Sequence, residues 1–451
     1  MRSFAILPLA AAASAFVVPD FETFSQLPVH GQQPHRDDSS WQDWFPSADS
    51  ISSSVHDVVD SLSSGVEETF HAVKGKLETE LESIFDEDAG SAVEEVDAAD
   101  KPRRGGRHEN KYTTKFAELV DEHEDIVQLL NSTKANYTLF VPVDSAFEHI
   151  PKDKKPSKEF VESVLKYHIG LGLYPAGRVL VTHTLPTALD EPLLGNKPQR
   201  LRTSVGLLSG VRVNFYSKVV AVDIGAKNGV IHAVRSLLVP PPFVGRELSL
   251  FPGKFSTLLL AFDKTDFTSF IHGQVLNGST IFAPDNRAFQ RLGPGANAFL
   301  FNTETGIKYL KAILKYHVVA NETVYSDAYY SQGEDDSKAQ DDVGRGHYHL
   351  DLPTLLGDKR IALDVARWAG FIRLKINGYI PIAVQDGIAK NGVVHVPANV
   401  LIPPHKDHKG GEEESSVTGE ISVEELKERL AGYVEGEEEQ VEKAPKIEIE
   451  L

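Results

Sequence analysis

Apolar and polar positions follow the same pattern at two places in the chain. In YTLFVP (residues 137–142) and STIFAP (residues 279–284), apolar side chains alternate with small or polar ones, which is typical of a half-buried strand. The closing proline has no N–H to donate to a neighbouring strand, so we expect the strand to end there. The following runs, DSAFEHI and DNRAFQRL, begin a helix with a phenylalanine directed inward. The repeated stretch therefore predicts a strand-to-helix corner.

Two polar residues mark this corner. Asp144 and Asn286 hold the same position, four residues after Phe140 and Phe282. Short side chains with oxygen acceptors are preferred at helix N-caps, because they accept hydrogen bonds from the free N–H groups of the first turn. We therefore predict that each residue caps the helix that follows it and has a structural role.

The rest of each copy repeats in the same order. Each copy opens with a helical pattern, KFAELV at residues 115–120 or KFSTLLL at residues 254–260. A later helical pattern ends in a Tyr-His pair, and a strand that begins with Asn-Gly, a signal for a tight turn with positive φ, closes the copy. Landmarks in the same order indicate an internal duplication. The pairs are Tyr167, His168, Tyr316 and His317, and the turn residues are Asn228, Gly229, Asn391 and Gly392.

These landmarks resemble the motifs of the fasciclin (FAS1) domain family. TLFVPVDSAF and TIFAPDNRAF are similar to its first motif, and NGVIHAV and NGVVHV are similar to its second. The resemblance covers residues 112–241 and 251–404 and implies two tandem domains of the α+β class. Each domain would be a compact twisted β-sandwich or wedge with packed helices. Because the link PFVGRELSL is short, we expect the two domains to touch.

The resemblance also implies candidate contact residues. In animal members of the family, the Tyr-His region and an Asp-Ile element before the second motif are linked to integrin binding. Tyr167-His168 and Tyr316-His317 match the pair, and Asp223-Ile224 matches the element. The second copy has Asp386-Gly387 instead, and both copies lack the flanking Glu-Pro and Met, which argues against an integrin-type contact.

The N-terminus predicts entry into the secretory pathway. MRSFAILPLAAAASAF contains Arg2, an apolar run and an Ala-Ser-Ala exit, the pattern of a signal peptide over residues 1–15. A short apolar N-terminal helix is the alternative. No later run reaches the roughly 20 apolar residues that span a bilayer. The C-terminus is charged, so we expect neither a transmembrane segment nor a lipid anchor.

The acidity of the chain belongs to its flanks. The formal net charge is −19, and residues 16–111 hold 8 basic and 21 acidic residues, while residues 405–451 hold 6 and 15. Both flanks are predicted to be largely disordered, apart from one short helix over residues 423–433. No dense basic stripe appears, so we expect no nucleic-acid partner. Arg103-Arg104 is a hypothetical processing site that would release the first flank.

One long amphipathic helix is predicted inside the first flank, near residues 51–85. Its apolar residues recur with an eleven-residue period, close to 3.67 residues per turn, which places them on one helix face. We expect it to dock on the protein itself or to self-associate. A lipid-surface helix is the alternative, which its acidic polar face disfavours. The apolar positions are Val55, Val59, Leu62, Val66, Phe70, Val73, Leu77, Leu81 and Ile84.

Four Asn-x-Ser/Thr sequons agree with a secretory route. They begin at Asn131, Asn136, Asn277 and Asn321. Asn136 crowds the strand that follows it, so we expect lower occupancy there than at the other three. The layout of a signal, acidic flanks and two divergent copies is similar to that of secreted fungal members of the family.

Catalytic and cofactor motifs were sought and none was found. The chain has no cysteine, which excludes disulfides and thiolate metal sites. It has no G-x-S-x-G, no H-E-x-x-H and no phosphate-binding glycine loop, so we predict neither an enzyme nor a cofactor. His347 and His349, with His405 and His408, are the candidates for a transition-metal site. Surface histidines are more often unliganded, and we expect no metal there.

Three functions remain open from the sequence. The first is a non-catalytic adhesion or interaction module of the secretory pathway that contacts cell-wall, matrix or other glycoprotein partners. The second is a soluble vacuolar or lumenal protein whose acidic flank acts as a pro- or sorting segment. The third is an enzyme of unrecognised type. Neither the protein or glycan ligand nor the oligomeric state follows from the sequence.

Overall fold

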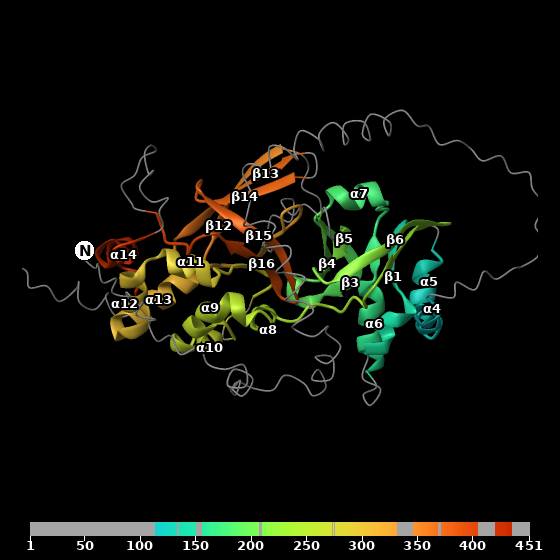
Figure 1. Ribbon diagram of the computed structural model, residues 1–451, viewed down its shortest axis with the longest axis horizontal. Helices are drawn as coiled ribbons and strands as arrows, with labels where there is room; N and C mark the ends of the chain where they lie inside the picture. Colours follow the sequence, from blue (N-terminus) through green and yellow to red (C-terminus); the bar gives the residue numbers. More distant parts are fainter. Residues whose placement is uncertain are drawn as a thin grey trace, which may run out of the picture. The chain divides into compact units, whose positions relative to one another are not determined.

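The structure, a computed structural model, describes residues 113–132, 135–149, 156–206, 210–272, 274, 276–331, 346–368, 371–404 and 420–434. These residues form two domains, each with helices packed on a curled sheet, which confirms the α+β class (Figure 1). The signal peptide, the amphipathic helix near residues 51–85 and the Arg103-Arg104 site lie outside the described residues.

Domain 1 closes its strands into a barrel in the order β1 to β7, with β1 parallel to β7. The two repeated motifs are therefore neighbours, since Phe140 lies opposite His232 in this pairing. The elements are α4 (Thr114–Asp121), α5 (Glu124–Leu130), β1 (Tyr137–Pro142), the 3₁₀-helix η2 (Asp144–His149), α6 (Lys158–Tyr167), β2 (Ile169–Leu171), α7 (Ala176–Val181), β3 (Thr184–Glu191), η3 (Pro192–Leu194), β4 (Lys197–Gly206), β5 (Gly210–Val213), β6 (Ser217–Ala226) and β7 (Gly229–Val234).

Domain 2 repeats this topology in a seven-stranded sheet ordered β12-β13-β14-β15-β16-β8-β9, with β16 parallel to β8. His395 lies opposite Phe282, as His232 lies opposite Phe140. The elements are α8 (Val244–Ser249), α9 (Pro252–Lys264), α10 (Phe267–His272), β8 (Ser279–Phe282), α11 (Asn286–Arg291), α12 (Pro294–Asn302), α13 (Glu304–Tyr316), β9 (Val318–Ala320), β10 (Glu322–Val324), β11 (Tyr329–Ser331), β12 (Gly346–Pro353), β13 (Arg360–Trp368), β14 (Phe371–Ile376), β15 (Ile380–Ala389), β16 (Gly392–Pro397) and α14 (Val423–Leu430).

The strand-to-helix corner is present in both domains, but its capping differs from the prediction. In domain 2 the N-cap of α11 is Asp285, whose carboxylate accepts from the N–H three residues later at 2.8 Å. Asn286 instead accepts from the Thr257 N–H of α9 at 2.9 Å. Asp144 likewise accepts from the Lys115 N–H in the first turn of α4 at 2.9 Å. Both residues therefore hold the first long helix of their domain against the corner, and the predicted local caps are wrong.

The Asn-Gly pairs mark turns after β6 and β15; Gly392 has a positive φ of +155°, whereas Gly229 does not have a positive φ. Neither asparagine has a positive φ. A Cβ added at Gly229 would lie 2.1 Å from the carbonyl oxygen of Tyr137, and one at Gly392 would lie 2.1 Å from that of Ser279. The glycines are required because the first and last strands approach so closely. The Asn228 amide reaches the end of α5, donating to a carbonyl at 2.7 Å.

This close approach gives a test of the fold. We expect Gly229→Ala to lower the free energy of unfolding by about 3 kcal/mol, because the methyl group meets backbone that cannot rotate away. Gly225 on β6 has no atom within 4 Å of an added Cβ. We therefore expect Gly225→Ala to change stability by less than about 0.5 kcal/mol. Urea unfolding followed by circular dichroism measures both, and equal losses would contradict the assignment.

One helix of the C-terminal flank belongs to domain 2. The sequence predicted it over residues 423–433, and α14 ends slightly earlier, at Leu430. Ser422 caps it by accepting from the Glu425 N–H at 3.1 Å. Leu426 and Leu430 are buried in the core of domain 2, where α14 packs on α12 and α13. In the part of the chain that the structure describes, no helix is long and apolar enough to cross a membrane.

Candidate functional site

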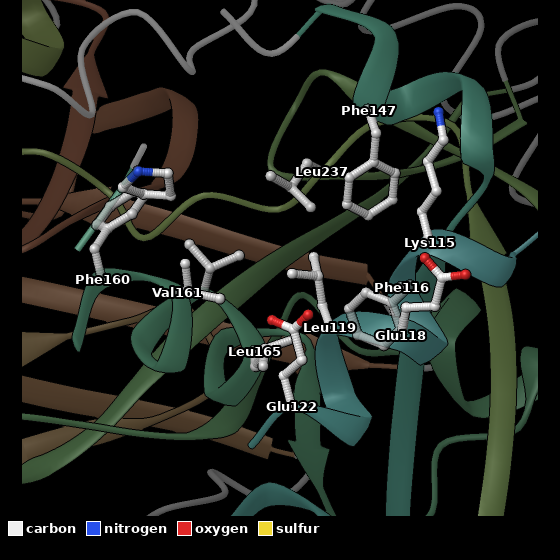
Figure 2. Close-up of a pocket in the computed structure, with 12 residues that line it drawn as sticks. Lys115, Phe116, Glu118, Leu119, Glu122, Phe147, Phe160, Val161, Leu165 and Leu237 are labelled. Carbon is white, nitrogen blue, oxygen red and sulfur yellow. The ribbon is translucent and has the colours of Figure 1, made fainter. Parts of the chain in front are cut away.

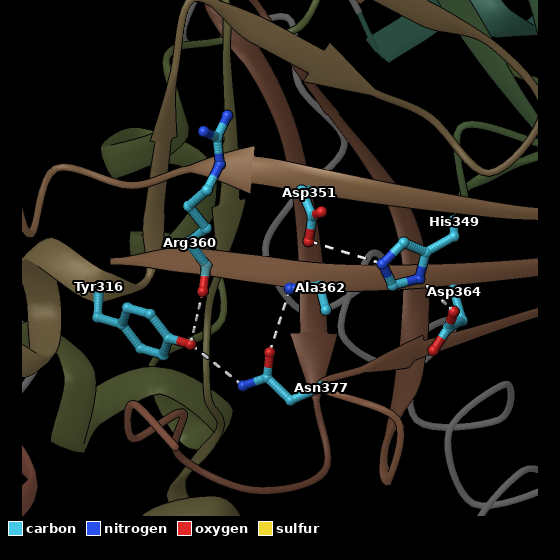
Figure 3. Close-up of polar contacts among 7 residues, drawn as sticks. All are labelled: Tyr316, His349, Asp351, Arg360, Ala362, Asp364 and Asn377. Carbon is cyan, nitrogen blue, oxygen red and sulfur yellow. Dashed lines mark hydrogen bonds and ion pairs between the residues drawn. The ribbon is translucent and has the colours of Figure 1, made fainter. Parts of the chain in front are cut away.

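The tyrosines of the two Tyr-His pairs are inside the domains. Tyr167 donates to the carbonyl of Arg200 at 3.0 Å and is fully buried. Tyr316, also buried, donates to the carbonyl of Arg360 at 3.1 Å and accepts from Asn377 at 3.1 Å (Figure 3). In domain 1 the matching bond is made by Asn214, which donates to the Tyr167 hydroxyl at 2.9 Å. The matching bonds show that Arg200 and Arg360 occupy equivalent positions, and that the tyrosines join a helix to the sheet.

The histidines of the pairs are equally structural. His168 has Nδ1 at 2.7 Å from the carbonyl oxygen of Val164, and its Nε2 accepts from the Leu238 N–H at 3.0 Å. His317 makes the equivalent contacts at 2.8 and 2.9 Å. Burial lowers the pKa of both histidines to about 4, although the neighbouring carbonyl oxygen acts in the opposite direction. Both side chains are therefore neutral at pH 7, and neither is available to a partner in the folded domain.

The Asp-Ile element, by contrast, lies on the outside of β6. Asp223 has a φ of +57°, and its carboxylate accepts from the Ala176 N–H at 2.8 Å. Its own N–H donates to Nδ1 of His232 at 3.3 Å, so the aspartate fixes a bulge in the strand. Ile224, the next residue, is 43% exposed. The resemblance implies six contact residues, and Ile224 is the apolar one among them that lies on the surface.

Ile224 is one of three exposed large apolar side chains on β6. Val220, Val222 and Ile224 are 45%, 46% and 43% exposed, and we call them the β6 patch. Among the described residues, β6 pairs with β7 along its length but with β5 only at Ser217 and Lys218, so one strand edge beyond Lys218 is unpaired. Contiguous exposed apolar side chains commonly mark interaction sites. The patch is the candidate site for a partner.

The two domains contact each other through buried charged groups. Asp327, in the turn between β10 and β11, accepts from the N–H groups of His183 and Thr184 at 2.9 and 2.7 Å and from the Thr184 hydroxyl. Arg200 of β4 is 2% exposed and donates to the Thr184 carbonyl at 3.1 Å. It also donates to the Tyr330 hydroxyl at 3.0 Å. The contact expected from the short link is present.

The same interface covers the end of β15. Arg202 donates to the carbonyl of Gln385 at 3.0 Å, and a glutamine of β4 donates to that of Ala389 at 3.0 Å. Asp386 of β15 donates its N–H to a second-motif histidine, as Asp223 of β6 does, so the two strands are equivalent. Domain 1 therefore contributes β3 and β4 to the interface, whereas domain 2 contributes β15 and the turn between β10 and β11. Domain 1 contacts β15 at the carbonyl groups of Gln385 and Ala389, whereas the equivalent strand of domain 1, β6, carries the exposed β6 patch.

Of the four histidines predicted as candidates for a metal site, His347 and His349 lie on β12, and His349 contacts carboxylates. His349 contacts Asp364 at 2.8 Å and Asp351 at 3.6 Å (Figure 3). The hydrogen bond to Asp364 raises the pKa of His349. Within the described ranges, no three His, Cys, Asp or Glu side chains are grouped to hold a metal. His405 and His408 lie outside the described residues.

The sequons differ in how their asparagines are used. Asn131, Asn136 and Asn277 are exposed, whereas Asn321 is half-buried. Asn321 also has a φ of +60°, and its side-chain oxygen accepts from the Asn277 N–H at 2.9 Å. This bond engages the side-chain oxygen of Asn321 and not the nitrogen to which a glycan attaches, so it does not change the predicted order. Occupancy itself stays a prediction.

The sequence comparisons agree with the duplicated topology. A sequence model of the fasciclin domain matches residues 111–240 and 253–403. The chain is 29% identical to aurofusarin biosynthesis cluster protein S of Gibberella zeae over 313 residues, which cover 66% of this chain and 76% of that protein. It is 30% identical to stabilin-2 of Rattus norvegicus over 200 residues, which cover 41% of this chain and 13% of that protein.

Two further similarities complete the comparison. Transforming growth factor-beta-induced protein ig-h3 of Oryctolagus cuniculus is 29% identical over 268 residues, covering 59% of this chain and 33% of that protein. Among solved structures, a FAS1 domain pair from the insect cell adhesion molecule fasciclin I has a TM-score of 0.30 and 18% identity, covering 64% of this chain and 96% of that one. The chain thus spans most of the Gibberella protein and a small part of stabilin-2 or ig-h3.

Proposed function

This chain belongs to the fasciclin domain family, and from that premise we propose that it is a non-catalytic interaction module of the secretory pathway, whose β6 patch binds a protein partner. The observation that carries the proposal is the exposure of Val220, Val222 and Ile224 on a strand whose equivalent in domain 2 is covered. The family implies contacts at a cell surface, cell wall, matrix or organelle lumen, where such a module would act.

The chemistry of the patch favours a protein over a glycan. Its valine and isoleucine side chains offer apolar area but no hydrogen-bonding groups and no aromatic face for a sugar ring. The unpaired edge of β6 offers backbone N–H and C=O groups, which suit an added strand. A partner with an extended apolar segment would therefore satisfy both the side chains and the strand edge.

The buried polar groups support the non-catalytic part of the proposal. His168, His317, His232 and His395 are all enclosed and hydrogen-bonded to backbone groups. A catalytic acid or base must reach its substrate. Each of these histidines instead connects a helix or a loop to the neighbouring strands.

A double substitution tests the patch. We expect Val222→Lys with Ile224→Lys, in the full-length glycosylated protein, to reduce retention on cell-wall or matrix preparations at least tenfold. The reason is that two exposed apolar contacts become charged without any change to the core. Trp368→Lys is the matched control, because Trp368 is 50% exposed on domain 2. Retention that is unchanged in the double variant, or reduced equally in the control, would contradict the proposal.

The destination of the protein needs a separate measurement. The second function, a soluble vacuolar or lumenal protein with an acidic pro- or sorting segment, uses the same fold and differs only in location. Microscopy of the tagged chain distinguishes the two. A signal confined to the vacuole or another lumen would favour the second function, and a signal at the wall or in the medium would favour the first.

A further inference from the structure

A pocket of about 310 Å³ opens on the helical side of domain 1 (Figure 2). Its walls are apolar side chains of α4, η2 and α6, and the charged residues that line it are Lys115, Glu118 and Glu122 of α4. Both glutamates are exposed, and in the described part of the chain neither carboxylate forms a hydrogen bond or ion pair. The walls include Phe116, Leu119, Phe147, Phe160, Val161 and Leu237.

The equivalent place in domain 2 is filled by the chain itself. The repeated first motif makes Phe289 of α11 the counterpart of Phe147. Phe301 of α12 packs against Phe289, with ring centroids 5.9 Å apart. Phe301 and Leu300 are both buried in the core. Helix α12 therefore covers, in domain 2, the wall that is open in domain 1.

Domain 1 has too little chain at this point to build its own α12. Twelve residues separate α11 from α13, and nine of them form α12. Only eight residues separate η2 from α6. A nine-residue helix with its turns does not fit into that connection, so an occupant of the domain 1 pocket must come from another part of the chain or from another molecule.

Domain 2 shows that a flank of this chain can supply such a helix. Helix α14 belongs to the C-terminal flank, and it packs on α12 and α13 through Leu426 and Leu430. The N-terminal flank precedes α4, one wall of the pocket, in the chain, and it holds the apolar row Val66, Phe70, Val73 and Leu77 at helical spacing.

We propose that residues 66–77 of this chain bind the pocket of domain 1 as an amphipathic helix, with Phe70 in the place that Phe301 takes in domain 2. Charge supports this register. Residues 66–77 carry Glu67 and Glu68 at the start and Lys74 and Lys76 toward the end, with no acidic residue from Thr69 to Leu77. The two lysines are complementary to Glu118 and Glu122 of the pocket.

The chain between residues 66–77 and α4 is long enough for the segment to reach the pocket, and this covalent link also favours binding. Thirty-six residues lie between Leu77 and Thr114, and an extended chain of that length spans on the order of 100 Å. Reach is therefore not limiting. A tether of this kind holds the segment near the pocket at an effective concentration in the millimolar range. An individually weak contact through a few apolar side chains would then be largely formed.

The absence of cysteine from the chain makes a direct test possible. In the full-length protein, Lys74→Cys is combined with Glu118→Cys in the pocket, and separately with Lys218→Cys on β6. After mild oxidation, mass spectrometry measures the fraction of intramolecular disulfide. We expect the pocket pair to form at least ten times more disulfide than the β6 pair. Phe70→Asp in the same background should abolish the difference.

Phe85→Asp is the matched control for Phe70→Asp. Phe85 lies in the same flank but outside the apolar row, so Phe85→Asp should leave the pocket disulfide unchanged. Thermal unfolding checks that the domains are intact in each variant. Equal disulfide at both positions, insensitivity to Phe70→Asp, or disulfide formed only between chains would overturn the proposal. None of these outcomes bears on the β6 patch, which is tested by retention.

Discussion

Asp327→Ala is expected to lower the free energy of unfolding by about 3–5 kcal/mol, because it leaves two buried backbone N–H groups and a buried hydroxyl of domain 1 without their acceptor. The carboxylate of Asp327 is 2% exposed and accepts from two backbone N–H groups of domain 1 at 2.9 and 2.7 Å. Without it, those N–H groups stay buried without an acceptor, and the buried guanidinium of Arg200 loses a nearby negative charge. Burial alone would lower the pKa of Arg200, but Tyr330 and Asp327 hold it above its ordinary value.

The substitution should also change the form of the unfolding curve. With the interface weakened, we expect the single cooperative transition to separate into two, one for each domain. Scanning calorimetry and urea unfolding measure both effects. Asp364→Ala is the control, since Asp364 forms an exposed pair with His349 and such pairs contribute about 0–1 kcal/mol. If the two variants lose the same stability, the buried contact does not have the role assigned to it.

The arginines give the same test from the other domain. Arg200 and Arg360 occupy equivalent positions, yet Arg200 is buried at the interface and Arg360 is exposed, with its guanidinium directed away from Tyr316 in Figure 3. Arg200→Met should therefore be strongly destabilising, while Arg360→Met should be nearly neutral. The carbonyl groups that accept from the tyrosines are unchanged in both variants.

This pair also shows where prediction from the sequence succeeded and where it failed. The corner, the turn positions and the duplication were predicted correctly, because they depend on local residue patterns that repeat. The environment of Arg200 was not predicted, because burial of an arginine depends on a face supplied by the other domain. The stretches QRLRT and KRIAL look alike in the sequence. The only signal for the interface was the short link between the copies.

The candidate site was predicted only in part, for a related reason. The resemblance directed attention to Tyr167-His168 and Tyr316-His317, which the structure places in the interior. A neutral histidine with two backbone partners has no mark in a single sequence that separates it from a surface histidine. The β6 patch was missed because alternating Val-Ala-Val-Asp-Ile reads as an ordinary half-buried strand. Only the topology shows that one edge of it is unpaired.

Acidification is expected to destabilise the protein through these same buried histidines. His168 and His317 have pKa values of about 4 in the folded state because of burial, and about 6.5 when unfolded. Between pH 6.5 and pH 4 the unfolded chain therefore binds protons that the folded chain does not. The free energy of unfolding falls as the pH falls through this range, by about 3 kcal/mol for each histidine at pH 4. Above pH 7 these two groups contribute no pH dependence.

A buried carboxyl group acts in the opposite direction. Burial raises the pKa of Glu247 in α8 to about 8, and among the described residues its Oε2 has no hydrogen-bond partner. The folded chain therefore keeps a proton on Glu247 that the unfolded chain releases above about pH 4.5. Stability from this group is present at low pH and is lost as the pH rises toward 8. Together the groups predict a stability maximum near neutral or slightly acidic pH.

Three variants separate these contributions. Urea unfolding of the unmodified protein at pH 7, 6, 5 and 4 should show a steep loss below pH 6. His168→Gln and His317→Gln retain one donor and one acceptor, so each should cost about 1–2 kcal/mol at pH 7 and reduce the slope between pH 6 and pH 4 by up to one proton. Glu247→Gln should flatten the curve between pH 6 and pH 8 instead. A slope below pH 6 that is unchanged in both histidine variants would show that acid acts through other groups and that the pairs are not buried in neutral form.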